Sequence, residues 1–254
     1  MKWINYLSLL LLLFSCLSPR KEKKIVPVAA PIFELSLTTK PSHIEVMNVN
    51  FSKEGASFGK DPKKNSYLYV DSIPFIPDNF NMSCWFRVEG EEGKIAQALF
   101  KAIDTAHAHK QFGTWIAGFR ITGSLNSNFL SAKNFSKSET RSREYYDLPL
   151  LELGKYYFLS INKKEKQIAF YINAELYKEY TLPNDTEIGI NSLIFGALNF
   201  EGPYVNQFYG RIRNFEIYRQ PLSPDEIYSV SVKHFNEIQP FNDAFELSKF
   251  NIAH

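Results

Sequence analysis

The sequence predicts an all-β protein with one large domain and a short helix close to its C-terminal end. Three observations support this prediction. Apolar residues recur at every second position in several short segments, as in strands that bury one face. Segments rich in Gly, Pro, Asn and charged residues separate them. About 220 residues follow residue 32, which is enough for one core without disulfide bonds.

The first half of the domain supplies a series of short candidate strands. Residues 33–37 alternate cleanly, whereas residues 44–51 alternate less cleanly. Residues 95–103 fit a short helix by propensity as well as a strand. The candidate strands in this half are residues 33–37, 44–51, 56–58, 67–70, 82–88, 95–103 and 114–122.

Residues 123–147 are dominated by Ser, Asn, Lys and Arg. We expect a long hairpin here, with a mobile tip near residues 134–143 and a return strand at 144–148. The second half of the domain carries the strongest β pattern of the chain. Its candidate strands are residues 154–162, the hairpin at 167–180, residues 192–198 and residues 208–218.

The hairpin turn at Asn173-Ala174 departs from the usual chemistry. A two-residue type I′ turn needs a positive φ at both central residues, which favours Asn-Gly. Alanine in that conformation costs on the order of 1 kcal/mol. The sequence therefore predicts either a longer turn or modest strain at Ala174.

A helix is expected directly after the last strand. Ser223 fits an N-cap, Pro224 the first helical position, and Glu226 the third residue of a capping box. The helix should extend to about Phe235. The tail at 236–254 keeps Phe241, Phe245, Leu247 and Phe250, so we expect part of it to dock on the domain.

The N-terminus has the pattern of an export signal. Lys2 precedes an apolar core at residues 7–14, which is shorter than the roughly 20 residues needed to span a bilayer. The segment ending at Cys16 resembles a bacterial lipobox, although Phe14 stands where a small residue is preferred. We expect residues 1–15 to be removed and Cys16 to be lipidated. An ordinary signal peptide or an uncleaved anchor are the alternatives.

Residues 16–32 are expected to form an extended tether, because Pro19, Pro27 and Pro31 disfavour helix and strand pairing. Residues 20–24 carry three net positive charges, which would favour anionic lipid headgroups or belong to a solvated linker. The full chain carries +2, so the part beyond the signal and tether is close to −2. This charge argues against nucleic acid as a partner.

Cys84 would be the single cysteine of the mature chain if Cys16 is lipidated, which excludes an intramolecular disulfide. It lies in the alternating segment 82–88. We expect a buried, unreactive thiol there.

Four motifs carry a family resemblance: Gly154-Lys155-Tyr156, Tyr171-Ile172-Asn173-Ala174, Phe195-Gly196-Ala197, and residues 210–223. In this order they resemble the laminin-G-like branch of the concanavalin A-like jelly roll. The resemblance implies a two-sheet antiparallel jelly-roll sandwich over residues 33–230, with the helix end and a docking tail at 231–254. It also implies a strand at 95–103. It says little about function, because this fold hosts many activities.

The catalytic motifs of two enzyme classes are missing from the sequence. Glycosidases with this fold carry two carboxylates on alternate residues of one strand, in an E-x-D-x-E pattern, which does not occur here. Asp185 and Glu187 alternate, but within a loop-like segment. No G-x-S-x-G motif is present either. We therefore expect a protein that is not an enzyme.

Two groups of residues are candidates for metal binding. His107 and His109 are close in sequence but have no partner motif, and solvated loop histidines are the default interpretation. Laminin-G-like domains often hold Ca²⁺ at a loop edge. Asp104, Asn128 and Asp147 are candidate calcium ligands, without a D-x-D-x-D-G loop to assign them.

Aromatic residues make up 15% of the chain, and most should belong to the core. A minority in strand-end and loop positions could instead stack on sugar rings, with Asn206 as a hydrogen-bonding neighbour. Alternatively they close the edge of the sandwich. These candidates are Trp115, Tyr145, Tyr146, Phe200, Tyr204 and Asn206.

Together these features predict a lipid-anchored protein of the bacterial envelope, at the outer membrane or cell surface. Its jelly roll is expected to bind a glycan or a protein. A carbohydrate-active enzyme (glycosidase or lyase) with an unrecognised site is one alternative. A structural envelope lipoprotein without a small-molecule ligand is the other.

Overall fold

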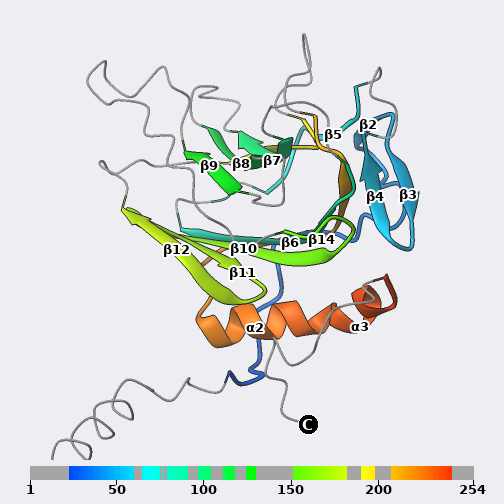
Figure 1. Cartoon of the computed structure of the whole chain (residues 1–254). Helices are drawn as coiled ribbons and strands as arrows, with labels where there is room; N and C mark the ends of the chain where they lie inside the picture. The colour runs from blue at the N-terminus through cyan, green and yellow to red at the C-terminus, as the bar shows by residue number, and fades with distance from the viewer. Residues whose placement is uncertain are drawn as a thin grey trace, which may run out of the picture.

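A computed structural model describes residues 23–59, 65–74, 76, 79–90, 97–103, 111–117, 124–129, 151–181, 190–197 and 207–241. For residues 111–117 and 124–129, and for Lys178 and Tyr180, it describes the backbone alone. The described strands form two antiparallel sheets that stack face to face, with helices on one outer side (Figure 1). This arrangement confirms the predicted jelly-roll sandwich.

The larger sheet has eight strands among the described residues. Its order is β12 (Glu175–Thr181), β11 (Gln167–Ile172), β10 (Tyr156–Lys164), β6 (Phe80–Val88), β14 (Gly210–Tyr218), β4 (Gly55–Phe58) and β3 (Asn50–Ser52), and β1 (Phe33–Leu35) also pairs with β14. Three of the four motifs of the family resemblance lie wholly or partly in this sheet or in its turns.

In the part of the chain that the structure describes, the smaller sheet has six strands. Its order is β2 (Glu45–Met47), β5 (Tyr67–Val70), β13 (Ser192–Phe195), β7 (Gln97–Ile103), β8 (Gln111–Ala117) and β9 (Ser124–Phe129). Residues 97–103 are therefore a strand, as the family resemblance predicted. Residues 124–129 form β9, which pairs with β8, while the tip at 134–143 and the return strand at 144–148 of the expected hairpin lie outside the described residues.

Residues 44–51 contribute to both sheets instead of forming one strand. β2 belongs to the smaller sheet and β3 to the larger sheet. The chain changes direction between them at Asn48, whose φ is +49°. Asparagine tolerates this left-handed conformation better than most residues, which explains why the alternation is broken here.

The main core lies between the inner faces of the two sheets. Phe215 of β14 meets Phe195 of β13 with ring centroids 4.8 Å apart, and Phe100 of β7 at 5.2 Å, both edge to face. Cys84 is completely buried in this core and free, as predicted, and burial raises the pKa of its thiol. The sandwich is thus held by apolar contact between sheets.

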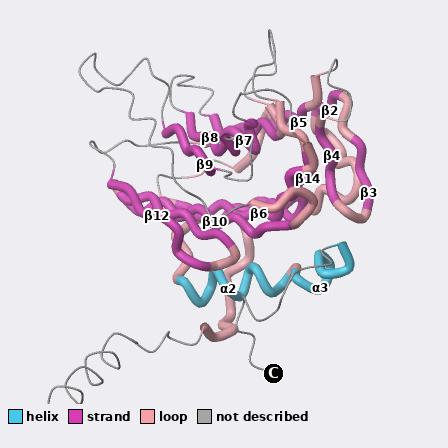
Figure 2. The backbone as a smooth tube through the Cα atoms, in the orientation of Figure 1, coloured by secondary structure: helices cyan, strands magenta, loops and turns pink. Residues whose placement is uncertain are grey.

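A helical layer covers the outer face of the larger sheet (Figure 2). It consists of α2 (Pro224–Lys233), α3 (Phe235–Ile238) and the 3₁₀ turn η1 (Gln239–Phe241). The predicted capping box at Ser223 and Glu226 is present. Helix α2 ends two residues earlier than expected and α3 follows directly. A second apolar cluster fills the space between sheet and helices, with Trp85 and Phe158 on the sheet and Ile227 and Tyr228 on α2.

The turn between β11 and β12 is a two-residue turn, with φ values of +50° at Asn173 and +60° at Ala174. Of the two outcomes that the sequence predicted, the strained short turn is therefore correct. Asn173 is well suited to it, because its side-chain Oδ1 accepts a hydrogen bond from the Phe158 N–H at 3.0 Å.

Candidate ligand-binding face

The outer face of the smaller sheet is the side of the sandwich that no described helix covers (Figure 1). The inner faces of both sheets are filled by the main core, and α2 and α3 close the outer face of the larger sheet. A ligand that binds a sheet face within the described part of the chain therefore has this one surface to use.

Strand register places four different side chains in one row across this face. Glu45 pairs with Tyr69, Tyr69 with Ile194, and Ile194 with Lys101. With strands about 4.8 Å apart, the row is about 14 Å long. It carries a carboxylate at one end, an aromatic and an aliphatic residue in the middle, and an ammonium at the other end.

The middle of the face is an apolar cluster separate from the main core. Tyr67, Ile194 and Ala197 are buried in it, and Tyr69 and Ile103 pack against it while remaining partly exposed. The Tyr67 hydroxyl donates a hydrogen bond to Glu45 Oε1. The cluster therefore presents the edge of an aromatic surface beside a fixed carboxylate.

Lys101 is partly buried at its end of the row, and this burial lowers the pKa of its ammonium. The row thus combines an aromatic surface with hydrogen-bonding groups of both signs.

Gln207 fixes one end of this face. Its Nε2 donates to the carbonyls of Ser66 and Gly196 at 2.8 Å each, and its Oε1 accepts from the Ser66 N–H at 2.8 Å. Phe208 N–H also bonds to Gly196 O at 2.8 Å. The parts of the chain on either side of residues 198–206 are therefore joined at the end of β13, beside the row.

The family comparison agrees with this architecture. A laminin-G family model described as "Concanavalin A-like lectin/glucanases superfamily" matches residues 62–228. The chain belongs to this superfamily. A comparison with curated proteins gave no match. The match covers both sheets from the approach to β5 onward and ends within α2.

Solved structures share the superfamily fold at low sequence identity. A pentraxin resembling serum amyloid P component, from Limulus polyphemus, superimposes with a TM-score of 0.55 at 14% identity, over 69% of this chain and 80% of that one. The binding domain of botulinum neurotoxin serotype D gives 0.53 at 18% identity, over 80% of this chain and 52% of that one. A mutant Trypanosoma rangeli sialidase gives 0.53 at 12% identity, over 77% and 30%.

This chain spans only about half of the toxin binding domain and less of the sialidase. These similarities are therefore evidence for its fold alone.

The residues that sequence analysis proposed as ligand contacts fall outside what the structure describes, with one partial exception. The backbone of Trp115 lies in β8, opposite Ala98 of β7 and Asn126 of β9. Sequence reasoning missed Tyr69 and Lys101, because alternation alone does not tell the outer face of a strand from the inner one. The candidates outside the described residues are Cys16, Tyr145, Tyr146, Phe200, Tyr204 and Asn206.

Most of the candidate metal ligands also lie outside the described residues. Asp104 and Asp147, together with His107 and His109, are not described. Asn128 pairs by backbone register with Gly113, which pairs with Lys101. Within the described residues, no three His, Cys, Asp or Glu side chains gather into a metal-binding group.

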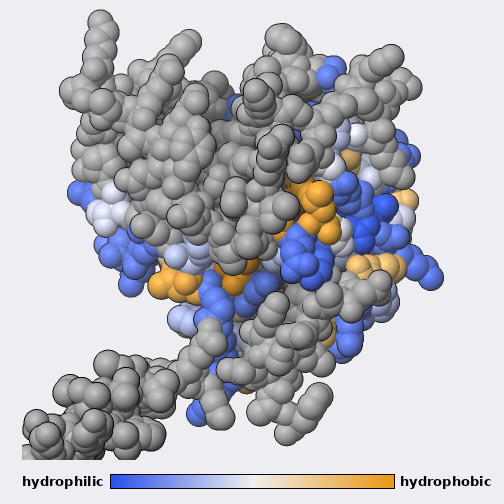
Figure 3. Space-filling model, viewed as in Figure 1, coloured by the Kyte–Doolittle hydropathy of each residue, from blue (hydrophilic) through white to orange (hydrophobic). Residues whose placement is uncertain are grey.

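Exposed apolar side chains are scattered over the described residues. In the view of Figure 3 the described surface is mostly hydrophilic, with hydrophobic residues in small separate areas. The large apolar side chains that are exposed among the described residues come from four different segments: Ile25, Met47, Leu153 and Leu176. A scattered arrangement of this kind differs from the contiguous patch that marks many protein interfaces.

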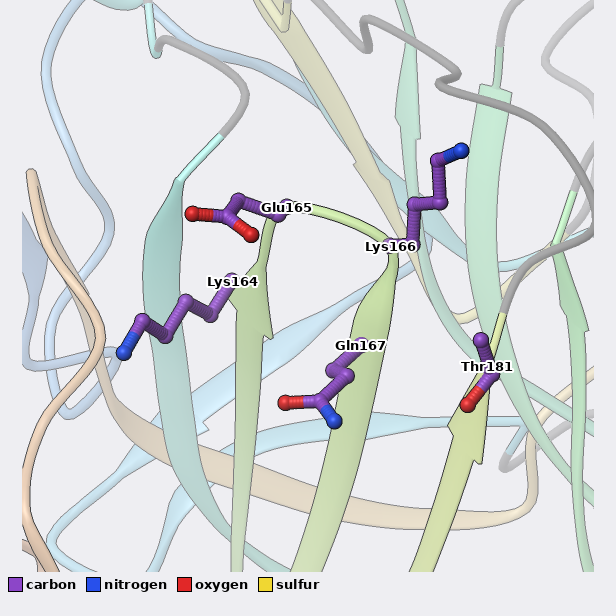
Figure 4. Close-up of a pocket in the computed structure, with 5 residues that line it drawn as sticks. All are labelled: Lys164, Glu165, Lys166, Gln167 and Thr181. Carbon is purple, nitrogen blue, oxygen red and sulfur yellow. The ribbon is translucent and has the colours of Figure 1, made fainter.

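Two other groups of charged residues in the domain do not have the geometry of a ligand-binding site. A hollow at the tip of the β10–β11 hairpin is lined by Lys164, Glu165, Lys166, Gln167 and Thr181, whose side chains spread apart rather than converge (Figure 4). At the opposite end of the larger sheet, Arg87 and Arg211 bind Glu54 and Glu89. Although burial opposes it, these hydrogen bonds hold the pKa of Glu89 below its usual range. The cluster is paired internally and stabilises the strands that carry it.

No helix among the described residues is long and apolar enough to cross a membrane.

Proposed function

We propose that this protein is a lipid-anchored receptor of the bacterial envelope whose concanavalin A-like domain binds a glycan on the outer face of the smaller sheet. One observation carries the proposal: α2 and α3 close the opposite face, and the remaining face holds the partly exposed Tyr69 between Glu45 and Lys101, above the buried Ile194. An aromatic surface can stack on a sugar ring, and the flanking charges can bond its hydroxyls.

The length of the row supports an oligosaccharide over a single sugar, because Glu45 and Lys101 are three strands apart. Lys101 favours a ligand that carries a carboxylate or another acidic group. The similar fold of the neurotoxin binding domain accords with a binding role. The protein-ligand alternative has weaker support, since the exposed apolar residues do not form one patch.

Catalysis by this face has less support than binding. The carboxylate in the row, Glu45, already accepts a hydrogen bond from Tyr67, and no second carboxylate pairs with it in the described row. A glycosidase needs two carboxyl groups about 5–10 Å apart. The same fold does occur in a sialidase, so activity on bound glycans is the outcome that would favour the enzyme alternative.

A glycan array tests the proposal with the full chain carrying Cys16→Ala, with and without calcium. Tyr69→Ala and Lys101→Met should each weaken binding at least about tenfold, which corresponds to about 1.4 kcal/mol. Leu176→Ala is the matched control, because Leu176 is exposed on β12 of the other sheet. Trp115→Ala and Tyr204→Ala examine the two aromatic candidates from the sequence.

Equal binding by Tyr69→Ala, Lys101→Met and the parent protein would place the site elsewhere. An array without any binding would reject the glycan and leave a protein ligand or a purely structural role. The anchor is tested separately: Cys16→Ala should abolish the added lipid mass and move the protein out of the membrane fraction.

A further inference from the structure

Residues 23–28 pack against the helical layer and make hydrogen bonds with it. The Val26 N–H donates to Ser229 Oγ at 2.8 Å, and the Lys24 N–H donates to Asp225 Oδ1 at 3.4 Å. Val28 packs against the apolar cluster beneath the helix. In Figure 1 the blue N-terminal segment begins on the far side of α2 from the sheets and passes the helix on its way to them.

Lys23 fixes the outer end of this segment. Its Nζ donates to Ala174 O and, at 2.8 Å, to Glu175 Oε1, both at the β11–β12 turn. The ammonium also lies 6.0 Å from the centre of the Tyr228 ring. The Lys23 side chain is 19% exposed, so most of it is covered by these contacts. We name residues 23–28 the clasp.

The burial of α2 agrees with a clasp on its outer side. Ile227 to Ser231 are five consecutive buried residues, which exceeds one helical turn. A helix that rests on a sheet alone would bury one stripe and expose the other side. Ser229 is the residue of this run that accepts the hydrogen bond from the clasp.

The clasp changes what the tether can do. If residues 16–32 were a flexible chain, the domain could turn freely about its lipid. Lys23 is instead held against the domain, so seven steps along the chain separate it from Cys16, and they span at most about 25 Å. The chain thus leaves the domain on the side of α2, with two sheets between it and the ligand-binding face.

We infer that the clasp orients the domain on its own membrane, with α2 and the clasp facing the lipid surface and the Glu45–Lys101 row facing away from it. This inference rests on the proposed lipidation of Cys16. The partner of the α2 side is the bilayer that holds the anchor. Lys24 of the clasp adds an exposed positive charge on this side, which suits anionic headgroups.

Energy transfer to dye-labelled lipid headgroups measures this orientation. The lipidated protein would be placed in vesicles of phosphatidylcholine and phosphatidylglycerol, with a donor dye at Asn236→Cys on α3 or at Met47→Cys on β2. Both positions are exposed and Cys84 is buried, so labelling is selective. Transfer should be severalfold stronger from position 236 than from position 47. Equal transfer, or stronger transfer from position 47, would overturn the inference.

A second set of variants links orientation to the clasp. Lys23→Ala combined with Val26→Pro removes the Lys23 contacts and the N–H that binds Ser229, so the difference between positions 236 and 47 should disappear. Lys40→Ala is the matched control, since it removes an exposed lysine that lies outside the clasp. A difference that survives in the double variant would show that the clasp does not set the orientation.

The clasp and the anchor can fail separately. The comparison uses the non-lipidated Cys16→Ala protein, with and without the two further substitutions Lys23→Ala and Ser229→Ala. The Val26 amide should exchange with solvent at least about tenfold more slowly in the protein without them. Fast exchange in both would refute the clasp whatever the anchor does. A wild-type protein that does not associate with membranes, with a protected Val26 amide, would refute the anchor and the orientation but keep the clasp.

Discussion

The Nζ of Lys233 lies 2.6 Å from Oε1 of Glu216, so the last turn of α2 is tied directly to the strand that it covers. His234 contacts the same oxygen at 3.0 Å, and the Tyr218 hydroxyl donates to the other carboxylate oxygen at 2.6 Å. The guanidinium of Arg213 on β14 lies 2.6 Å from the carboxylate of Glu237, and this ion pair links the strand to α3. The helical layer is therefore fastened by charge as well as by apolar contact.

Glu216 should make the stability of the protein depend on acidic pH. Burial alone would raise its pKa, but hydrogen bonds from His234, Lys233 and Tyr218 outweigh burial and hold the pKa at about 2. Because the folded pKa lies below the unfolded value, this stabilisation is present above about pH 4.5 and is lost as the pH falls towards 2. The shift corresponds to about 3 kcal/mol at most.

Urea denaturation between pH 7 and pH 2 measures this dependence. Glu216→Gln should remove most of the acid-dependent loss in unfolding free energy. Glu179→Gln is the control, because Glu179 is exposed on β12 and its variant should keep the parent profile. An unchanged pH profile in Glu216→Gln would show that other carboxylates control acid stability.

The Asn173 side chain and its backbone conformation should contribute separately to stability. Asn173→Gly keeps the positive φ but loses the hydrogen bond to the Phe158 N–H, which should cost about 1 kcal/mol. Asn173→Ala also forces alanine to φ +50°, which should add about 1 kcal/mol more. Equal unfolding free energies for the two variants, measured in urea, would disprove the strain component.

Lys101 should show its lowered pKa in two measurements. Between its folded pKa and the ordinary value of about 10.4, the unfolded chain binds more protons, so stability should rise with pH in that window. Lys101→Met should flatten this rise. Titration of the Lys101 side chain by NMR gives the pKa directly, and a value at or above that of ordinary lysines would contradict the burial argument.

Cys84 should be protected from reagents by the fold itself. In the Cys16→Ala protein it is the remaining thiol, and it is fully buried with a raised pKa. Labelling by a thiol-reactive dye should be negligible in buffer and complete in denaturant. Rapid labelling of the folded protein would mean that the centre of β6 opens far more readily than the packed core implies.

The sequence predicted the sandwich well where local pattern and tertiary structure agree. Alternation located β6, β11 and β14, and cap chemistry located the start of α2 at Ser223 and Pro224. It did not locate the division of residues 44–51 between two sheets, because the positive φ at Asn48 depends on long-range pairing of β2 and β3 with strands distant in sequence.

The candidate face was harder to predict than the fold. Tyr67 and Tyr69 alternate with Leu68 and Val70, and either pair could have faced the core. The register with β2 and β13 decides that the tyrosines face outward. Similarly, the hydrogen bonds from Lys23 and Val26 to residues distant in sequence have no local signature, so the contact of residues 23–28 with the helical layer was not predicted.

The side chain of Gln207 has a further consequence for how this protein could be altered. It bridges Ser66 and Gly196 and so joins the parts of the chain on either side of residues 198–206. Replacement of that segment by one of another length or composition should therefore leave the β13 and β5 pairing intact. Under the proposed binding function, residues 198–206 are therefore a segment that can be exchanged to change ligand recognition while the folding of the sandwich is preserved.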